Sequence, residues 1–220
     1  MKKLDYYQSF SPKLEMWFVE AHEEANSWDE GKSICIRYAL YPRRFYKTIA
    51  GFDHTKKTDY CFIGGFKTDQ RTENNRKWIL GFIEKYFTEM SYLQFTDKIT
   101  KSNYVIKGCF DYTLKNDGFV PKEHPVKERN KFDEKYFKQM AKSKFTLCPA
   151  GDSFWSMRFY EALMCRSIPI VNSVNETFRS KEESGLDYRY YLTTDNILFR
   201  EDWVEHNYRI FLKNHTLEII

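Results

Sequence analysis

Arg158 and Glu161 are the two residues whose types and spacing point most directly to ligand chemistry. They lie in the otherwise mostly apolar segment 156–165, and residues three apart on a helix share a face. An arginine can hold a phosphate through several N–H groups, and a carboxylate can accept hydrogen bonds from sugar hydroxyls. The alternative is an exposed ion pair, which the spacing fits equally well. The apolar neighbours favour burial and therefore the ligand.

The residues ahead of this helix predict an anion site. An apolar strand over 145–148 runs into the turn Pro149-Ala-Gly151, and Asp152, Ser153 or Ser156 could cap the helix that follows. A helix start presents backbone N–H groups without partners, which attract anions. Arg158 in the first turn conflicts with the helix dipole by roughly a few tenths of a kcal/mol. A bound diphosphate would remove that conflict.

The elements that must position these residues alternate between strands and helices. Apolar runs predict strands at 34–40, 59–65, 92–95, 104–106, 145–148, 168–172 and 188–192. Helical periodicity predicts helices at 72–87, 132–142, 156–165 and 201–212, and residues 113–130 have the composition of a surface loop. This alternation predicts an α/β fold, with one Rossmann-like, mostly parallel sheet and helices on both faces.

Composition excludes several classes of protein. The chain has 220 residues, 42% of them hydrophobic and 18% aromatic, which is typical of a folded globule. The net charge is +4 with basic and acidic residues interleaved, so no nucleic-acid partner is expected. No signal peptide or transmembrane segment is apparent, and the cysteines are odd in number and widely spaced, which predicts a soluble, cytoplasmic protein with reduced thiols. The cysteines are Cys35, Cys61, Cys109, Cys148 and Cys165.

Several blocks of sequence occur in an order that resembles the exostosin family of glycosyltransferases. They are Tyr60-Cys-Phe-Ile-Gly64 followed by Arg71, Ser143-Lys-Phe-Thr-Leu-Cys-Pro-Ala-Gly151, Ser156-Met-Arg-Phe-Tyr-Glu-Ala-Leu163, Ile168-Pro-Ile-Val171 and Gly185-Leu-Asp-Tyr-Arg-Tyr-Tyr191. Together they cover roughly residues 58–212, and several ordered blocks are more specific than one motif. The resemblance implies the carboxyl-terminal, nucleotide-sugar-binding half of a GT-B type enzyme.

The resemblance also implies an activity and a set of donor-binding residues. A sugar would move from a UDP-linked donor to a hydroxyl of a glycan or glycoconjugate, with inversion. Arg158 would hold the diphosphate and Glu161 the ribose or sugar hydroxyls. The Gly151 turn and Ser156 would supply hydrogen-bond donors, while Gly64 and Arg71 would close the phosphate side. For Gly64 a simple tight turn is the alternative, and for Arg71 a solvated charge.

No metal and no other cofactor is expected. The chain lacks an Asp-x-Asp motif, a Walker loop, a Gly-x-Gly-x-x-Gly loop and zinc-ligand spacing. Without a metal, the leaving diphosphate would be stabilised by Arg158, Arg71 and the helix start. His124 and His206 are lone histidines, for which an ordinary surface or core position is the simpler interpretation.

The amino-terminal region departs from the family pattern. Residues 58–220 are predicted to form the donor domain, and residues 1–57 an appendage too short for a complete second Rossmann-like domain. This appendage could supply part of the acceptor region, or a partner chain or second copy could complete it. No catalytic base is identified, because Asp53, His54 and Asp152 are candidates by sequence proximity alone. A non-catalytic remnant that binds a nucleotide sugar or glycan therefore stays open, as does a binding module unrelated to carbohydrate.

Overall fold

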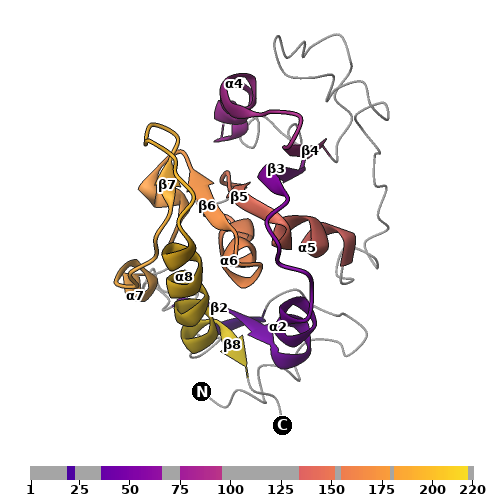
Figure 1. The fold of residues 1–220 in the computed structure, drawn as a ribbon. Helices are drawn as coiled ribbons and strands as arrows, with labels where there is room; N and C mark the ends of the chain where they lie inside the picture. Colours follow the sequence, from indigo (N-terminus) through magenta and orange to yellow (C-terminus); the bar gives the residue numbers. More distant parts are fainter. Residues whose placement is uncertain are drawn as a thin grey trace.

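A computed structural model describes residues 19–22, 36–65, 75–95, 134–151, 155–178 and 181–217 (Figure 1). Its centre is a five-stranded sheet in the order β4-β3-β5-β6-β7, and every neighbouring pair of strands is parallel. The strands are β3 (Thr58–Gly64), β4 (Tyr92–Phe95), β5 (Ser143–Leu147), β6 (Ile168–Val171) and β7 (Tyr191–Leu192). The predicted α/β, Rossmann-like sheet is confirmed.

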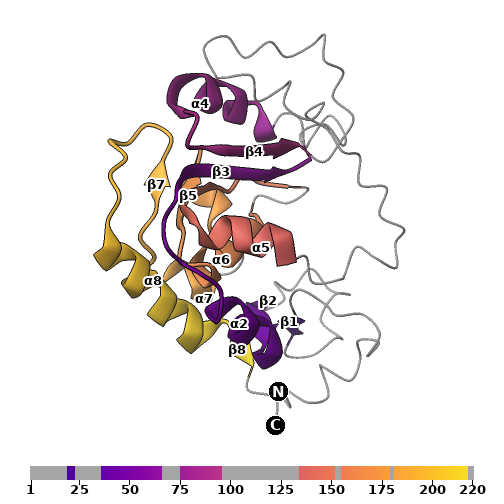
Figure 2. The ribbon, with the colours of Figure 1, turned by 45° about the vertical axis from the view of Figure 1, so that its right-hand side comes forward.

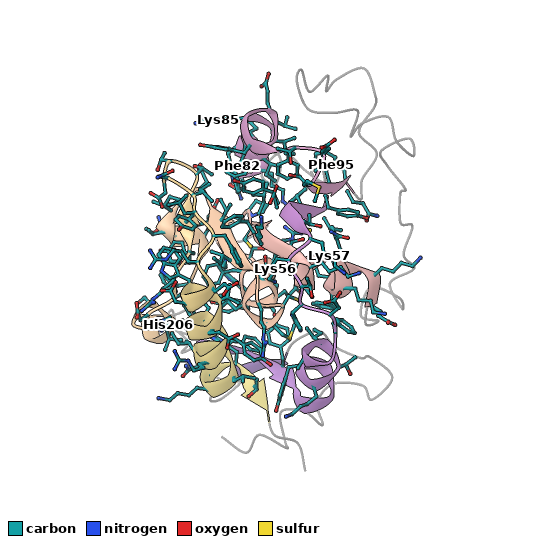
Figure 3. The ribbon with its side chains drawn as sticks, viewed as in Figure 1. Lys56, Lys57, Phe82, Lys85, Phe95 and His206 are labelled. Carbon is teal, nitrogen blue, oxygen red and sulfur yellow. The ribbon has the colours of Figure 1, made fainter. Side chains whose placement is uncertain are left out.

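Helices cover both faces of the sheet because side chains alternate between the faces along each strand. Phe145 and Leu147 of β5 share a core with Phe82 of α4 (Trp78–Tyr86) and Phe95 of β4. Phe82 and Phe95 lie at one end of the molecule (Figure 3). Cys148 and Val171 belong to a second core with α5 (Glu134–Ala141) and α6 (Met157–Met164).

The last long helix, α8 (Glu201–Asn214), joins the two cores. Val204 packs in the core of α4, whereas Tyr208 and Phe211 pack in the core of α5 and α6. Spacings of four and seven residues put these three side chains on one face, as the predicted amphipathic helix requires. Between β6 and β7 lie the short helices η3 (Val174–Glu176) and α7 (Lys181–Ser184).

The amino-terminal region joins the end of the described chain in a second, three-stranded sheet of order β1-β2-β8. Its elements are β1 (Val19–His22), β2 (Ile36–Pro42) and β8 (Thr216–Leu217), with α2 (Arg43–Ala50) after β2. This sheet and α2 lie at the opposite end of the molecule from α4 (Figure 2). Tyr41, Tyr46 and Ile49 pack into the core of α5, α6 and α8.

One predicted strand is shorter than expected. The run 188–192 forms a strand only over Tyr191–Leu192, because the Asn207 side chain of α8 takes the backbone groups of Arg189. Arg189 N donates to Asn207 Oδ1 at 2.8 Å, and Asn207 Nδ2 donates to Arg189 O at 2.6 Å. The predicted strand at 104–106 and loop at 113–130 lie outside the described residues.

Candidate functional site

The site lies where the direction of the chain across the sheet reverses. From β3 the chain passes through α4 to β4 on one side, and from β5 it passes through α6 to β6 on the other. The carboxyl ends of β3 and β5 are therefore neighbours whose following connections diverge. In parallel α/β sheets this point leaves room for a ligand. Gly64 ends β3, and the Gly151 turn with Ser156 and Arg158 follows β5.

Ser156 immediately precedes α6 and is its N-cap. Its Oγ accepts a hydrogen bond from the backbone N–H of Arg158 at 3.2 Å. Of the three capping residues that the sequence allowed, the structure uses Ser156, while Asp152 and Ser153 lie outside the described residues. The cap places the Arg158 side chain in the first turn of the helix, at the carboxyl edge of the sheet.

The Arg158 side chain reaches back from α6 to the end of β3. Its guanidinium lies over the ring of Phe62, with Cζ 5.0 Å from the ring centroid. It also fills the space that a side chain on Gly64 would need, since a Cβ added there would overlap Nη2 and lie 3.2 Å from Cζ. Gly64 therefore lets the Arg158 guanidinium pack directly against the end of β3, which a tight turn alone would not need.

Two nitrogens of the Arg158 guanidinium do not take part in these contacts. Nε and Nη1 are fully enclosed, yet neither has a hydrogen-bond partner among the residues that the structure describes. Burial alone would lower the pKa of Arg158, but the surrounding Tyr136, Cys148 and Glu161 raise it above its ordinary value. Arg158 is therefore a firmly protonated cation with unused donors, and such a group costs free energy unless an anion occupies it.

Glu161 is also buried, with 7% of its surface exposed. The hydroxyl of Tyr136 in α5 donates a hydrogen bond to its Oε2. Burial raises the pKa of Glu161, and the Tyr136 hydrogen bond and the Arg158 charge counteract that shift only in part. Glu161 and Arg158 make no ion pair within 4.0 Å. The alternative of an exposed Arg158–Glu161 ion pair is therefore wrong.

The sequence analysis missed Asn75 and Arg76, which precede α4. Arg76 Nε donates to the carbonyl of Ala150 at 3.2 Å, and its Nη1 donates to the carbonyl of Gly65. Asn75 Nδ2 donates to the carbonyl of Gly151 at 2.9 Å. These side chains tie the end of β3 to the turn after β5. A sequence signal for them existed, because two polar residues begin a helix that follows a strand ending in glycine.

Glu176 in η3 was missed as well. It is 8% exposed, and its Oε2 accepts the backbone N–H of Asn172, directly after β6, at 2.7 Å. Burial raises the pKa of Glu176, although hydrogen bonds from the backbone of Asn172, Ser173 and Ala150 counteract this shift. Glu176 thus fixes the turn after β6 to the turn after β5, and no sequence pattern distinguishes it from a surface acid.

The other predicted residues either lie elsewhere in the fold or fall outside the described residues. Arg71 and Asp152 lie outside the described residues, as does His124. Asp53 and His54 precede β3, at the opposite edge of the sheet. Asp53 pairs with Lys57 at 3.0 Å, and His54 Nε2 lies 2.9 Å from the carbonyl of Ile49. His206 in α8 contacts Asp187, with Nε2 3.1 Å from Oδ2, which fits the ordinary position expected for it.

The described part of the chain holds no set of three His, Cys, Asp or Glu side chains grouped to bind a metal ion. Cys61, Cys148 and Cys165 are buried free thiols, as predicted. Within the same residues, none of the helices combines the length and apolar character needed to span a membrane.

Comparison with known proteins agrees with the order of the sequence blocks and with the parallel sheet. No curated protein matches the chain. Among protein families, the Exostosin GT47 domain matches residues 64–210, which is more than half of the chain and runs from the end of β3 into α8. The chain belongs to the exostosin GT47 family of glycosyltransferases.

Proposed function

We propose that this protein transfers a sugar from a UDP-linked donor to a hydroxyl of a glycan or glycoconjugate, with inversion. The observation that carries the proposal is the Arg158 guanidinium at the junction of β3 and β5, with Nε and Nη1 enclosed and unpaired among the described residues. A diphosphate offers several acceptor oxygens to such a group and compensates its charge. Family membership supports the transfer of a sugar.

The neighbouring residues fit the parts of a sugar nucleotide. Arg158 would bind the diphosphate, with Gly64 leaving it room and the α6 start adding backbone N–H groups from the Gly151–Ser156 side. Glu161 would accept hydrogen bonds from hydroxyls of the ribose or the sugar. Arg71 is proposed to approach the same phosphates. When the glycosidic bond breaks, negative charge grows on the leaving diphosphate, and these fixed positive groups would stabilise it without a metal.

Binding tests the proposal directly. We expect UDP to bind the wild type and raise its melting temperature, and we expect Arg158→Ala to lose both effects. Each charge-assisted hydrogen bond is worth about 1.5–3 kcal/mol, so the loss of two would weaken UDP binding by about 100-fold or more. Calorimetry measures this change. Arg209→Ala removes an exposed arginine of α8 and serves as the matched control. A wild type that binds neither UDP nor any UDP-sugar would contradict the proposal.

A second candidate is donor binding without turnover by the chain alone. It is favoured by the positions of Asp53 and His54, which lie at the far edge of the sheet and cannot act as a base at Arg158. In this case a partner chain or a second copy would complete the acceptor site. Release of UDP from a panel of UDP-sugars with glycan acceptors separates the two candidates, since the second predicts binding but no release by the purified chain.

A further inference from the structure

Tyr136 is placed where it can control the Arg158–Glu161 pair. Its hydroxyl donates to Glu161 Oε2, and both residues are brought together by the packing of α5 against α6. The hydroxyl oxygen of Tyr136 also accepts a hydrogen bond from the Arg158 side chain, so Tyr136 lies between the two charged groups. Burial and the charge of Glu161 raise the pKa of Tyr136, while the Arg158 cation acts in the opposite direction. The hydroxyl therefore stays protonated and remains a hydrogen-bond donor.

The arrangement on α6 is unusual for two opposite charges. Arginine and glutamate three residues apart on a helix ordinarily approach each other. Here Glu161 is buried and Arg158 is partly buried, and attraction between charges is stronger there than in water. Nevertheless they are not within the 4.0 Å of an ion pair, and two guanidinium nitrogens have no partner in the described part of the chain. Among the described residues, the contact that holds the carboxylate is the hydrogen bond from the Tyr136 hydroxyl.

We propose that Tyr136 is a positioning residue whose hydroxyl holds the Glu161 carboxylate away from Arg158, so that the guanidinium stays open for the diphosphate of the donor. The inference rests on the proposed function for the identity of the ligand. The position of Glu161 in the ligand-free protein does not depend on it.

Besides Tyr136, the described surroundings of Glu161 contain one cation with which its carboxylate could pair, namely Arg158. The described groups whose charge interacts with it are Arg158 of α6, Tyr136 of α5, Tyr41 of β2, Cys148 after β5 and Cys165 after α6. Burial raises the pKa of both thiols and of Tyr41, so these groups are neutral. Arg158 is the cation among them. A carboxylate released by Tyr136 would therefore turn to Arg158 and occupy its free N–H groups.

The first experiment is a crystal structure of ligand-free Tyr136→Phe beside that of the wild type. We expect Glu161 to form a direct ion pair with Arg158 in the variant, with N–O distances of about 3 Å. A Glu161 side chain that keeps its wild-type position would overturn the inference. Both crystal structures are ligand-free, so this test of the Tyr136 role is valid even if the protein does not bind UDP.

The second experiment is a double-mutant cycle with inorganic pyrophosphate, which carries the diphosphate but no ribose. We expect Tyr136→Phe to bind pyrophosphate about 10-fold more weakly than the wild type, because the ligand must first break the new ion pair. Adding Glu161→Gln should restore most of that affinity, and this gain should exceed the gain that Glu161→Gln gives in the wild-type background. If Glu161→Gln has the same effect in both backgrounds, the inference is wrong.

Controls separate this role from general damage to the fold. Tyr92→Phe removes an exposed hydroxyl on β4, outside the site, and should leave pyrophosphate affinity unchanged. A loss of packing in Tyr136→Phe would lower affinity without rescue by Glu161→Gln, and that result also overturns the inference. If the wild type binds neither pyrophosphate nor UDP, the proposed function fails, and the crystal structures still decide the role of Tyr136.

Discussion

The two edges of the central sheet use their charged residues in different ways. At the amino edge, Lys57 pairs with Asp53 at 3.0 Å, Lys144 pairs with Asp59 at 2.7 Å, and Lys56 donates to the carbonyl of Ala141 at 2.8 Å. Lys56 and Lys57 lie at the start of β3 (Figure 3). At the carboxyl edge, Arg158 is partly buried, and two of its enclosed nitrogens have no described partner.

The difference separates structural charges from candidate binding charges. Each of these charged side chains at the amino edge has a partner or faces water. The fold therefore explains their positions without a ligand. The fold alone does not explain the enclosed nitrogens of Arg158, because a buried donor without a partner destabilises the protein. A cation whose enclosed nitrogens have no described partner is therefore a better indicator of a site than a high density of charge.

After Arg158→Ala, the largest effect is expected for Gly64→Ala, which tests the carboxyl edge directly. The backbone of Gly64 does not adopt a left-handed conformation, so alanine is acceptable there except for the overlap of its Cβ with the Arg158 guanidinium. We expect UDP affinity to fall by about 10-fold or more as Arg158 is displaced. Calorimetric titration measures this effect.

Gly81→Ala in α4 is the matched control for Gly64→Ala. A Cβ at Gly81 would meet nothing within 4 Å. Alanine in this exposed helical position should raise the free energy of unfolding by about 0.4–1 kcal/mol and leave UDP affinity unchanged. Equal UDP affinity in both glycine variants would show that Arg158 does not bind the ligand from its position over Gly64.

Arg76→Ala should give the next largest effect, mainly on stability. The variant leaves the carbonyls of Gly65 and Ala150 without their donor. We expect the free energy of unfolding to fall by about 1–3 kcal/mol, as measured by urea denaturation. Lys77→Ala changes the next, exposed residue and should have little effect. A stability loss no greater than that of Lys77→Ala would mean that Arg76 does not hold the two strand ends together.

The two edges should also respond to pH with opposite signs. Burial raises the pKa of Glu161 above 4.5, so the folded state holds a proton where the unfolded state has lost it. Its stabilising contribution is present below pH 4.5 and is lost as pH rises through the folded pKa. Hydrogen bonds from Thr55 and Lys57 lower the pKa of Asp53 below 3.8, so its contribution is present above pH 3.8 and is lost on acidification.

Urea denaturation across this pH range tests the opposition of signs. Relative to the wild type, Glu161→Gln should gain stability as the pH rises from 4.5, because the variant has no buried charge to form. Asp53→Asn should be less stable than the wild type above pH 3.8, and this difference in the free energy of unfolding should shrink as the pH falls below 3.8. Curves for Glu161→Gln and the wild type that stay parallel above pH 4.5 would contradict the assigned burial of Glu161.

Lys57→Ala should give the smallest effect. The ion pair with Asp53 is exposed, and such pairs contribute little because water and side-chain entropy offset their attraction. We expect the melting temperature to change by about 1 °C or less and the effect to shrink further in added salt. If Lys57→Ala lowered the melting temperature more than Arg76→Ala does, charged contacts at the amino edge would matter more for stability than those at the carboxyl edge.

Prediction from sequence succeeded where local pattern and spacing carry the information. The apolar runs of β3, β5 and β6 and the periodicity of α8 were recognisable, because buried parallel strands and amphipathic helices have distinct patterns. Gly64, Ser156, Arg158 and Glu161 were also singled out, and the structure places Gly64 at the end of β3 and the other three at or within α6. Their role in binding stays a prediction. The shortened strand β7 was not predictable, because it ends where Asn207 of α8 takes the backbone of Arg189.

By itself, the sequence determined the α/β class, the family and which charged side chains stand out on α6. Those properties depend on the order and periodicity of residues along the chain. The tertiary structure decided that Arg158 lies over Gly64, that Arg76 ties Gly65 to Ala150, and that Tyr136 rather than Arg158 holds Glu161. These contacts join residues far apart in the chain, and the packing of the strands and helices around them determines which polar groups find partners.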